Sequence, residues 1–560
     1  MLLLLLFAWL RVSDRPPPDV RPAIQAYLSH GSEKTGFMWT DPEQRQLNEL
    51  YASAGYEPLW IEPTGRVSRC ADETLALLEA AADEGLAPET YQAGELNRLR
   101  ATRLAATSVS APELARYDVA LSAGMLRYLL HLHSGRVDPQ TVGFRLGAPA
   151  DRPDLNALLR SAAKDGRVIE AAAALRPPFA QYDALRATLS RYRLLALVPD
   201  SGRGELPSFP AVLHPGERYL GLEALRQRLT AFGDLPPGLS VDDKTSYEGA
   251  LVEGVKRFQL RHGLTSDGIV GTSTQAALHV PLAWRVRQIE LALERLRWLP
   301  VLGPQRLIAI NIPMFRLWAW ESGSSRLDPS FGVNVIVGRA MRTRTPVFVE
   351  QMREVIFRPF WNVPPSIARH EIVPLLERDP DYLRRQQMEI VRGPGDDARA
   401  VAATEENIAL LKQGLLRVRQ RPGPQNSLGL IKFVFPNADN VYMHGTPAQA
   451  LFSRSRRDFS HGCVRVEDPV ALAEWVLSEG HDWGRDRILS AMAGTQSIHV
   501  PLSQPIPVLL FYTTAAVTPE DGTIHFAEDI YRHDAVLDRA LTLVTASHVV
   551  GRPSGGPCPP

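Results

Sequence analysis

Apolar residues in the C-terminal half of the chain fall into short runs with the character of β-strands. The segments 307–312 and 316–320 are rich in β-branched and aromatic residues, a pattern typical of a hairpin. The runs 331–337 and 354–357 extend the same sheet. We therefore predict a mainly β domain whose functional residues lie on loops at one end. Two last apolar runs are expected to complete this domain: 507–512 and 524–526.

The N-terminal part of the chain carries apolar residues at helical spacing instead. The run 74–83 ends near Gly85, a residue type favoured at helix C-termini, and 119–130 forms a second helical run. Its aromatic residues are expected in the core, since nothing in this region suggests chemistry. We interpret residues 20–205 as a helical N-terminal scaffold domain.

A third helical block covers residues 215–282. Leucines recur three and four residues apart from Leu222 to Leu229, and 251–264 forms an amphipathic helix. The turn at 267–271 precedes a third helix. This pattern fits either a small binding module or a three-helix bundle without a ligand.

One cysteine lies close in sequence to two histidines. Cys463 follows His461 by two residues, and His444 lies upstream, each histidine being followed by glycine. A nearby imidazole lowers the pKa of a thiol or accepts its proton, so Cys463 is the candidate nucleophile. Cys70 and Cys558 have no histidine nearby. These residues are also soft metal ligands, but the paired cysteines of structural zinc sites are lacking. We expect neither metal nor cofactor.

The local sequence mounts these residues on a hairpin. The strands expected at 430–435 and 441–443 flank a turn, which places His444 at the end of the second strand. The polar segment 447–459 then returns Cys463 toward that strand. A helix is expected shortly after the cysteine, because Asp468 caps it and proline takes its first position.

The segments 441–446 (Val-Tyr-Met-His-Gly-Thr) and 460–465 (Ser-His-Gly-Cys-Val-Arg) together resemble the signature of the L,D-transpeptidases of bacterial cell-wall synthesis. The resemblance implies a cysteine enzyme that acts on the stem peptides of peptidoglycan. It implies Cys463 as the nucleophile and His444 as the general base, with the backbone carbonyl of Gly445 orienting the His444 ring.

The resemblance assigns further roles within the second motif. His461 and the amides of Gly462 and Cys463 would lie around the oxyanion. Many members carry asparagine where this chain has Arg465, and an arginine there fits the longer members of the family. Such a side chain would bind a substrate carboxylate with two hydrogen bonds. The substrate-binding candidates are Arg465, Ser460, Thr446 and Trp361.

The same resemblance orders the domains. The block at 215–282 is similar to a peptidoglycan-binding module, and 20–205 to the scaffold of the long transpeptidase subgroup. The catalytic domain is expected at 304–535, with a helical insertion at 366–423 that acts either as a lid or as a surface decoration. The remaining segments are an export-signal remnant and Pro-rich spacer at 1–18, a linker helix at 283–303 and a disordered tail at 540–560.

Composition narrows the classes of function. The chain has 62 basic and 62 acidic residues, so no nucleic-acid footprint is expected. At 560 residues it is too long for one core. Its start, ten apolar residues before Arg11, has the length of a signal-peptide core and is too short to span a bilayer. We expect export to the periplasm or cell envelope.

The sequence thus predicts an α+β multidomain L,D-transpeptidase that forms 3-3 crosslinks through a cysteine thioester. Water as the acceptor would make it an L,D-carboxypeptidase or endopeptidase. An inactive wall-binding scaffold and a cysteine peptidase on unrelated substrates are the alternatives. Peptidoglycan stem peptides and glycan are the expected partners, with other cell-wall synthesis enzymes as further candidates. The resemblance also implies acylation of Cys463 by carbapenems.

Overall fold

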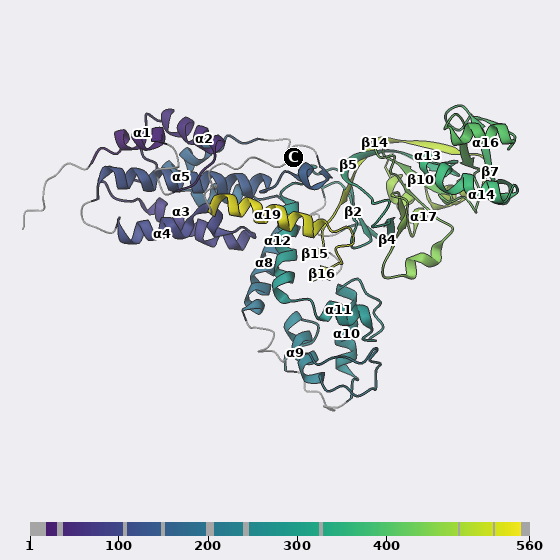
Figure 1. Cartoon of the computed structure of the whole chain (residues 1–560), viewed down its shortest axis with the longest axis horizontal. Helices are drawn as coiled ribbons and strands as arrows, with labels where there is room; N and C mark the ends of the chain where they lie inside the picture. The colour runs from purple at the N-terminus through teal and green to yellow at the C-terminus, as the bar shows by residue number, and fades with distance from the viewer. Residues whose placement is uncertain are drawn as a thin grey trace, which may run out of the picture.

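The computed structural model describes residues 18–30, 37–104, 109–146, 152–197, 206–238, 246–323, 329–479, 482–518 and 521–549. Figure 1 shows a helical part, a small helical module beside it, and a β domain that ends in an insertion. This arrangement confirms the predicted α+β multidomain fold. The export signal expected at 1–18 lies almost wholly outside the described residues.

The helical part is built around one long helix, α5 (Ala111–Ser134), which is buried along most of its length. Asp118 on α5 accepts hydrogen bonds from the Tyr51 hydroxyl at 2.6 Å and the Trp60 amide at 2.8 Å. A 3₁₀ turn after α3 ends at Gly85 with φ of 69°, as its sequence predicts. The other helices of this part are α1 (Arg21–His30), α2 (Asp41–Ala52), α3 (Arg69–Glu79), α4 (Ala93–Thr102), α6 (Leu155–Asp165), α7 (Val168–Ala174) and α8 (Ala180–Ala196).

The small module consists of α9 (Leu222–Phe232), α10 (Ala250–Arg261) and α11 (Thr272–Leu278). The leucines that recur at helical spacing on α9 are buried. The Gln259 side chain ties α10 to the following turn, because its amide donates to Ile269 O at 2.9 Å and its carbonyl accepts from Gly268 N at 2.8 Å.

The β domain is a sheet that closes on itself. The strand order is β1-β5-β10-β11-β13-β4-β3-β2-β14, and β14 also pairs with β5, which closes the ring. The apolar faces of these strands enclose one core. The strands are β1 (Phe144–Arg145), β2 (Leu307–Asn311), β3 (Arg316–Trp320), β4 (Phe331–Gly338), β5 (Val347–Phe357), β10 (Ile431–Val434), β11 (Met443–His444), β12 (Asp458–Ser460), β13 (Val464–Val466) and β14 (Ile498–Phe511). The helices α17 (Pro469–Val476) and α18 (Arg485–Ala493) pack on the sheet.

The insertion contains a sheet as well as the predicted helices. Four strands pair in the order β6-β9-β7-β8, and the helices cover them around a separate small core. The strands are β6 (Trp361–Asn362), β7 (Met388–Arg392), β8 (Arg399–Val401) and β9 (Arg417–Gln420). The helices are α13 (Pro365–Ile367), a π-helical turn (Ala368–Ile372), α14 (Val373–Arg378), α15 (Tyr382–Arg385) and α16 (Glu405–Lys412).

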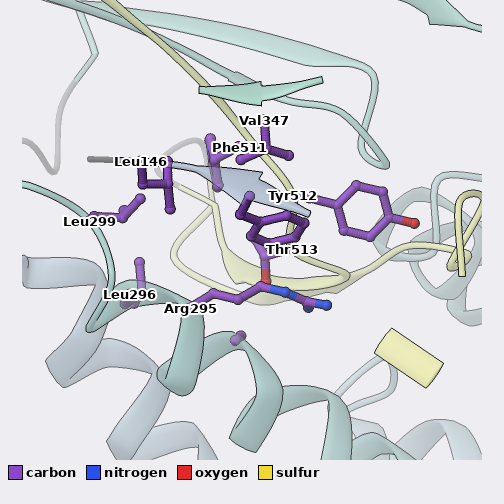
Figure 2. A pocket seen from close by; sticks show the side chains of 10 residues that line it. Leu146, Arg295, Leu296, Leu299, Val347, Phe511, Tyr512 and Thr513 are labelled. Atoms are coloured by element: carbon purple, nitrogen blue, oxygen red, sulfur yellow. The ribbon is translucent and has the colours of Figure 1, made fainter. Parts of the chain in front are cut away.

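The expected linker helix is a buried element. Helix α12 (Leu282–Leu296) packs between the helical part and the barrel, and its charged residues Glu294 and Arg295 are buried. Figure 2 shows Arg295 below Thr513, which follows β14, and Leu296 near Leu299 and Leu146. The space left there is about 10 Å³, hardly enough for one water. This seam is therefore closed packing and not a ligand site.

Two C-terminal predictions are wrong. The strand β16 (Ile524–Phe526) pairs with β15 (Ala515–Val517) and not with the barrel. Its apolar residues belong to the core that the helical part and the small module share. The tail expected to be disordered from 540 is helical to 549, in α19 (His533–Val549), whose Leu537 and Leu541 are buried. Figure 1 shows α19 running back beside the helical part. The Gly/Pro-rich residues 550–560 lie outside the described residues.

Candidate active site

Adjacent strands of the barrel place the candidate residues in one row. Lys432 on β10 is paired with His444 on β11, which is paired with Arg465 on β13. Directly paired residues point to the same face of a sheet, so these three side chains lie next to one another on one face. Their sequence neighbours point the other way, into the core: Phe433, Met443 and Val464.

His444 is buried, and a backbone hydrogen bond fixes the orientation of its ring. Its Nδ1 donates to the carbonyl oxygen of Gly445 at 2.5 Å, the contact that the family resemblance implies. This hydrogen bond fixes the tautomer and leaves Nε2 with a free lone pair. Burial and the nearby charge of Arg465 lower the pKa of His444 to about 3, so the imidazole is neutral at rest.

Cys463 precedes β13 and alternates onto the same face as Arg465. Its thiol lies 3.8 Å from the carbonyl oxygen of Asn440. Burial raises the pKa of Cys463, although hydrogen bonds from Tyr442 and the charges of Lys432 and Arg465 act in the opposite direction. The thiol and the imidazole are therefore both neutral at rest, and a thiolate forms on Cys463 only when its proton moves.

Hydrogen bonds hold the turn before the cysteine in a fixed shape. Ser460 Oγ donates to Cys463 O at 2.6 Å and accepts from the amide of Gly462 at 3.1 Å. Thr345 Oγ1 donates to Gly462 O at 2.8 Å. Gly462 has a φ of 115°, which favours glycine at this position.

These bonds correct one expectation about the oxyanion. The amide of Gly462 was expected to face it, but this amide is already engaged by Ser460. Among the residues that the structure describes, the amide of Cys463 has no acceptor. The Cys463 amide is therefore available as a backbone donor.

The other predicted residues take different places. His461 points to the insertion, where its Nε2 lies 2.8 Å from Oε1 of Glu371. Thr446 is buried and its hydroxyl accepts from the amide of Ala448 at 3.2 Å, which shapes the loop after His444. Trp361 begins the insertion on β6, and its side chain opposes the rise that burial causes in the pKa of Tyr442. Thr446 thus has a structural contact, whereas Trp361 lies at the edge of the site.

Arg465 has spare hydrogen-bonding capacity. Its Nε is buried and has no partner within the described part of the chain. Burial and repulsion from Arg339 lower the pKa of Arg465 below its ordinary value. A guanidinium in this state gains from an added carboxylate.

Two residues of the site were missed by the sequence analysis. Lys432 lies with its Nζ 4.1 Å from the centre of the Tyr442 ring, and both influence the charge on Cys463. Burial lowers the pKa of Lys432, while the Cys463 thiolate would raise it. The available signal was a lysine inside an otherwise apolar strand.

The barrel and the two parts that precede it each match a known domain family. Residues 305–500 match the model of the L,D-transpeptidase catalytic domain, called YkuD, and include both histidine motifs. These residues form an L,D-transpeptidase domain. Residues 220–278 match a model described as "Putative peptidoglycan binding domain", and residues 45–189 match a scaffold domain.

Two individual proteins are similar to parts of this chain. A Haemophilus influenzae protein named "Putative L,D-transpeptidase" is 33% identical over 233 residues, which is 42% of this chain and 45% of that protein. The match thus spans less than half of the relative's length. A crystal structure of an L,D-transpeptidase from Xylanimonas cellulosilytica covers 55% of this chain and 100% of its own at 17% identity. Its TM-score of 0.17 supports no structural argument.

Two further observations describe the chain around this L,D-transpeptidase domain. Within the described residues, no helix is both long and apolar enough to cross a bilayer. In the same residues, no three His, Cys, Asp or Glu side chains converge in a way that would hold a metal ion.

Proposed function

We propose that the chain is an L,D-transpeptidase that crosslinks peptidoglycan stems through a thioester on Cys463. The observation that carries the proposal is the register of β11 and β13. It puts Cys463, His444 and Arg465 on one face of an L,D-transpeptidase domain. A peptidoglycan-binding domain on the same chain is consistent with this substrate.

In the acylation step, Cys463 Sγ attacks the carbonyl carbon of the third residue of a tetrapeptide stem. The thiol proton passes to Nε2 of His444, whose Nδ1 hydrogen bond to Gly445 holds the ring in place. The Cys463 amide donates to the developing oxyanion. The carbon–nitrogen bond then breaks, and His444 protonates the departing amine of the terminal alanine, leaving the acyl group on sulfur.

The second step transfers the acyl group. The side-chain amine of a neighbouring stem attacks the thioester carbonyl and loses a proton to His444. The thiolate leaves and recovers its proton, so Cys463 is restored. A 3-3 crosslink results. Water in place of the amine would give a shortened stem, the carboxypeptidase outcome.

Charge assists both steps. Formation of an imidazolium at His444 is costly beside Arg465, and burial adds to that cost. A thiolate on Cys463 offsets it, as does a substrate carboxylate bound to the guanidinium of Arg465. Productive proton transfer is therefore tied to the bound substrate.

The same proposal covers the setting of the enzyme. A substrate in the cell wall places the protein in the periplasm or cell envelope, and carbapenems would acylate Cys463 as they imitate the stem amide. The insertion, whose Glu371 binds His461, acts as a lid over the acyl-enzyme and limits entry of water.

Mass spectrometry of disaccharide-tetrapeptide incubated with the protein and with its Cys463→Ala variant tests the proposal. We expect a dimer that lacks one terminal alanine, formed by the parent and absent with the variant. Shortened monomer alone would show hydrolysis and refute the crosslinking activity. Turnover that survives in the variant would remove Cys463 as the nucleophile. An unchanged substrate with both proteins would favour the wall-binding scaffold.

A further inference from the structure

A wide groove separates the peptidoglycan-binding module from the barrel. Its volume is about 990 Å³. One wall is the end of α10 with the following loop, the floor is α12, and the other wall is the β2–β3 turn with the segment 453–457. Figure 1 shows α10 and α11 on the same side of α12 as the barrel. Two domains that the family comparison treats as separate thus share one concave surface.

The groove carries guanidinium groups that no carboxylate neutralises. Arg285 on α12 binds Gln288 Oε1 at 2.9 Å and Ala277 O at 3.2 Å, while Arg457 binds Arg454 O at 2.9 Å and Phe315 O at 3.1 Å. In the described part of the chain, no carboxylate lies within 4.0 Å of either guanidinium. An anionic ligand would supply the missing charge.

The acidic residues of the groove are already engaged. Asp521 accepts from His525 Nε2 at 2.9 Å and from the Thr518 hydroxyl at 2.7 Å. Glu528 pairs with Arg456 at 3.3 Å. Asp529 accepts from the Tyr512 hydroxyl at 2.6 Å. The free charge of the groove is therefore positive.

Apolar and aromatic side chains lie between these charges. Trp284 is half-buried on the floor, and Leu260 on the module wall is 57% exposed. Phe315 lies under the Arg457 guanidinium, 5.4 Å from it. Flat aromatic surface beside cations suits a ligand with sugar rings and carboxylates.

The groove leads to the reacting sulfur along one strand. Arg457 on its wall is followed by β12, which ends at Ser460, and Ser460 Oγ binds Cys463 O. Asn334, also on the wall, lies two residues before Ile336, the partner of Arg465 across the sheet. A strand rises about 3.3 Å per residue, so the end of the groove is within the reach of a stem peptide from the site.

We propose that this groove binds an uncrosslinked peptidoglycan strand, an anionic glycopeptide, and directs one of its stems to Cys463. The inference rests on the proposed function for the use of the stem, but the binding itself does not require catalysis. The glycan contacts Trp284 and Leu260, and stem carboxylates pair with Arg454 and Arg457.

Binding is measured with the full chain carrying Cys463→Ala, so that turnover cannot interfere. The probes are soluble uncrosslinked glycan strands with tetrapeptide stems, and polyglutamate as a polyanion without sugar. The test variants are Trp284→Ala and Arg454→Glu, the latter at an exposed side chain that a folded protein tolerates. Arg69→Glu, on the distant scaffold with 91% of its side chain exposed, is the matched charge-reversal control.

We expect each test variant to bind the strands about tenfold more weakly, with Arg69→Glu unchanged. In the chain with Cys463 intact, the test variants should lose the same factor in kcat/KM on strands, and a smaller one on disaccharide-tetrapeptide, which is too short to occupy the whole groove. Unchanged strand affinity in Arg454→Glu, or polyglutamate binding as tight as strand binding, would overturn the proposal that the groove binds peptidoglycan strands. Strand binding that depends on Trp284 without any turnover would retain the groove and refute the proposed activity instead.

Discussion

The barrel has neighbours on two sides, and they are attached in opposite ways. On the side of α12, buried ion pairs join the parts: Glu294 lies 3.0 Å from Arg136 and 3.2 Å from Arg297, and Arg295 lies 2.6 Å from Asp534. The strand β1 from the helical part adds directly to β5 in the sheet. This side has the buried charge network of a domain core.

The insertion on the other side has a core of its own and touches the barrel through exposed pairs. Glu371, half-exposed, meets His461, and Asp396 lies 3.4 Å from His499. Exposed pairs of this kind contribute little to stability. The difference leads us to propose which part moves: the scaffold holds the barrel still, while the insertion opens over the site.

The largest effect is expected on the fixed side. Glu294→Ala leaves Arg136 and Arg297 buried without their common carboxylate, which should cost about 3–5 kcal/mol of unfolding free energy. Burial raises the pKa of Glu294, but the charges of the two arginines outweigh it and leave the pKa below its ordinary value. Its ion-pair stabilisation is thus present above the unfolded pKa and lost as pH falls through the folded one.

Thermal and urea unfolding at several pH values measure this prediction. The difference in unfolding free energy between parent and variant should be largest at neutral pH. It should shrink on acidification below about 4.5, where the carboxyl of the unfolded chain titrates. Glu253→Ala, which breaks an exposed pair with Lys256, serves as the control and should change little. A small, pH-independent loss in Glu294→Ala would mean that the α12 side is not held by this network.

An intermediate effect is expected from removing the insertion. Val363 N donates to Val418 O at 3.0 Å, so the two ends of the insertion are already adjacent. Replacing residues 364–417 with Asn-Gly should close them as a hairpin. With less covering the site, the raised pKa of the Cys463 thiol should fall toward its ordinary value.

Alkylation of Cys463 at pH 7, followed by intact mass in a Cys70→Ser, Cys558→Ser background, should become faster in the shortened protein, because a larger fraction of the thiol is ionised. Hydrolysis of the stem should increase relative to crosslinking. If alkylation and product ratio both match the parent, the insertion is a surface decoration and the comparison between the two sides loses its functional meaning.

Much of the β domain could be predicted, because the sequence patterns that indicate its strands and its site span only a few residues. The hairpin of β2 and β3 and the strands around His444 show alternation over a few residues, and the candidate nucleophile and base lie within twenty residues of each other. Asp468 caps α17 by accepting from Ala471 N at 3.0 Å, as its sequence indicates.

The missed elements depend on contacts between distant segments. Strand β1 has two residues and is defined only by its pairing with β5, about two hundred residues later. The strands of the insertion are short and polar, β9 being Arg-Val-Arg-Gln, so burial by tertiary packing decides their structure. Helix α19 was obscured by the Gly/Pro-rich residues that follow it.

The same distinction applies to the site. The roles proposed for His444 and Cys463 follow from adjacent motifs, but the contact between His461 and Glu371 joins residues ninety positions apart. That contact also defines the smallest expected effect. Glu371→Gln removes the charge from the insertion's contact with the motif while preserving its shape.

We expect Glu371→Gln to change stability by less than about 1 kcal/mol, because the pair is solvent-exposed. Since the contact holds the insertion near the thioester, the ratio of hydrolysis to crosslinking should rise two- to threefold, roughly 0.5 kcal/mol in that partition. Product analysis with a tetrapeptide substrate measures it. Glu377→Gln, whose partner Lys412 lies within the insertion, is the matched control and should leave the ratio unchanged. An equal shift in both variants would assign the effect to the charge of the insertion and not to its hold on His461.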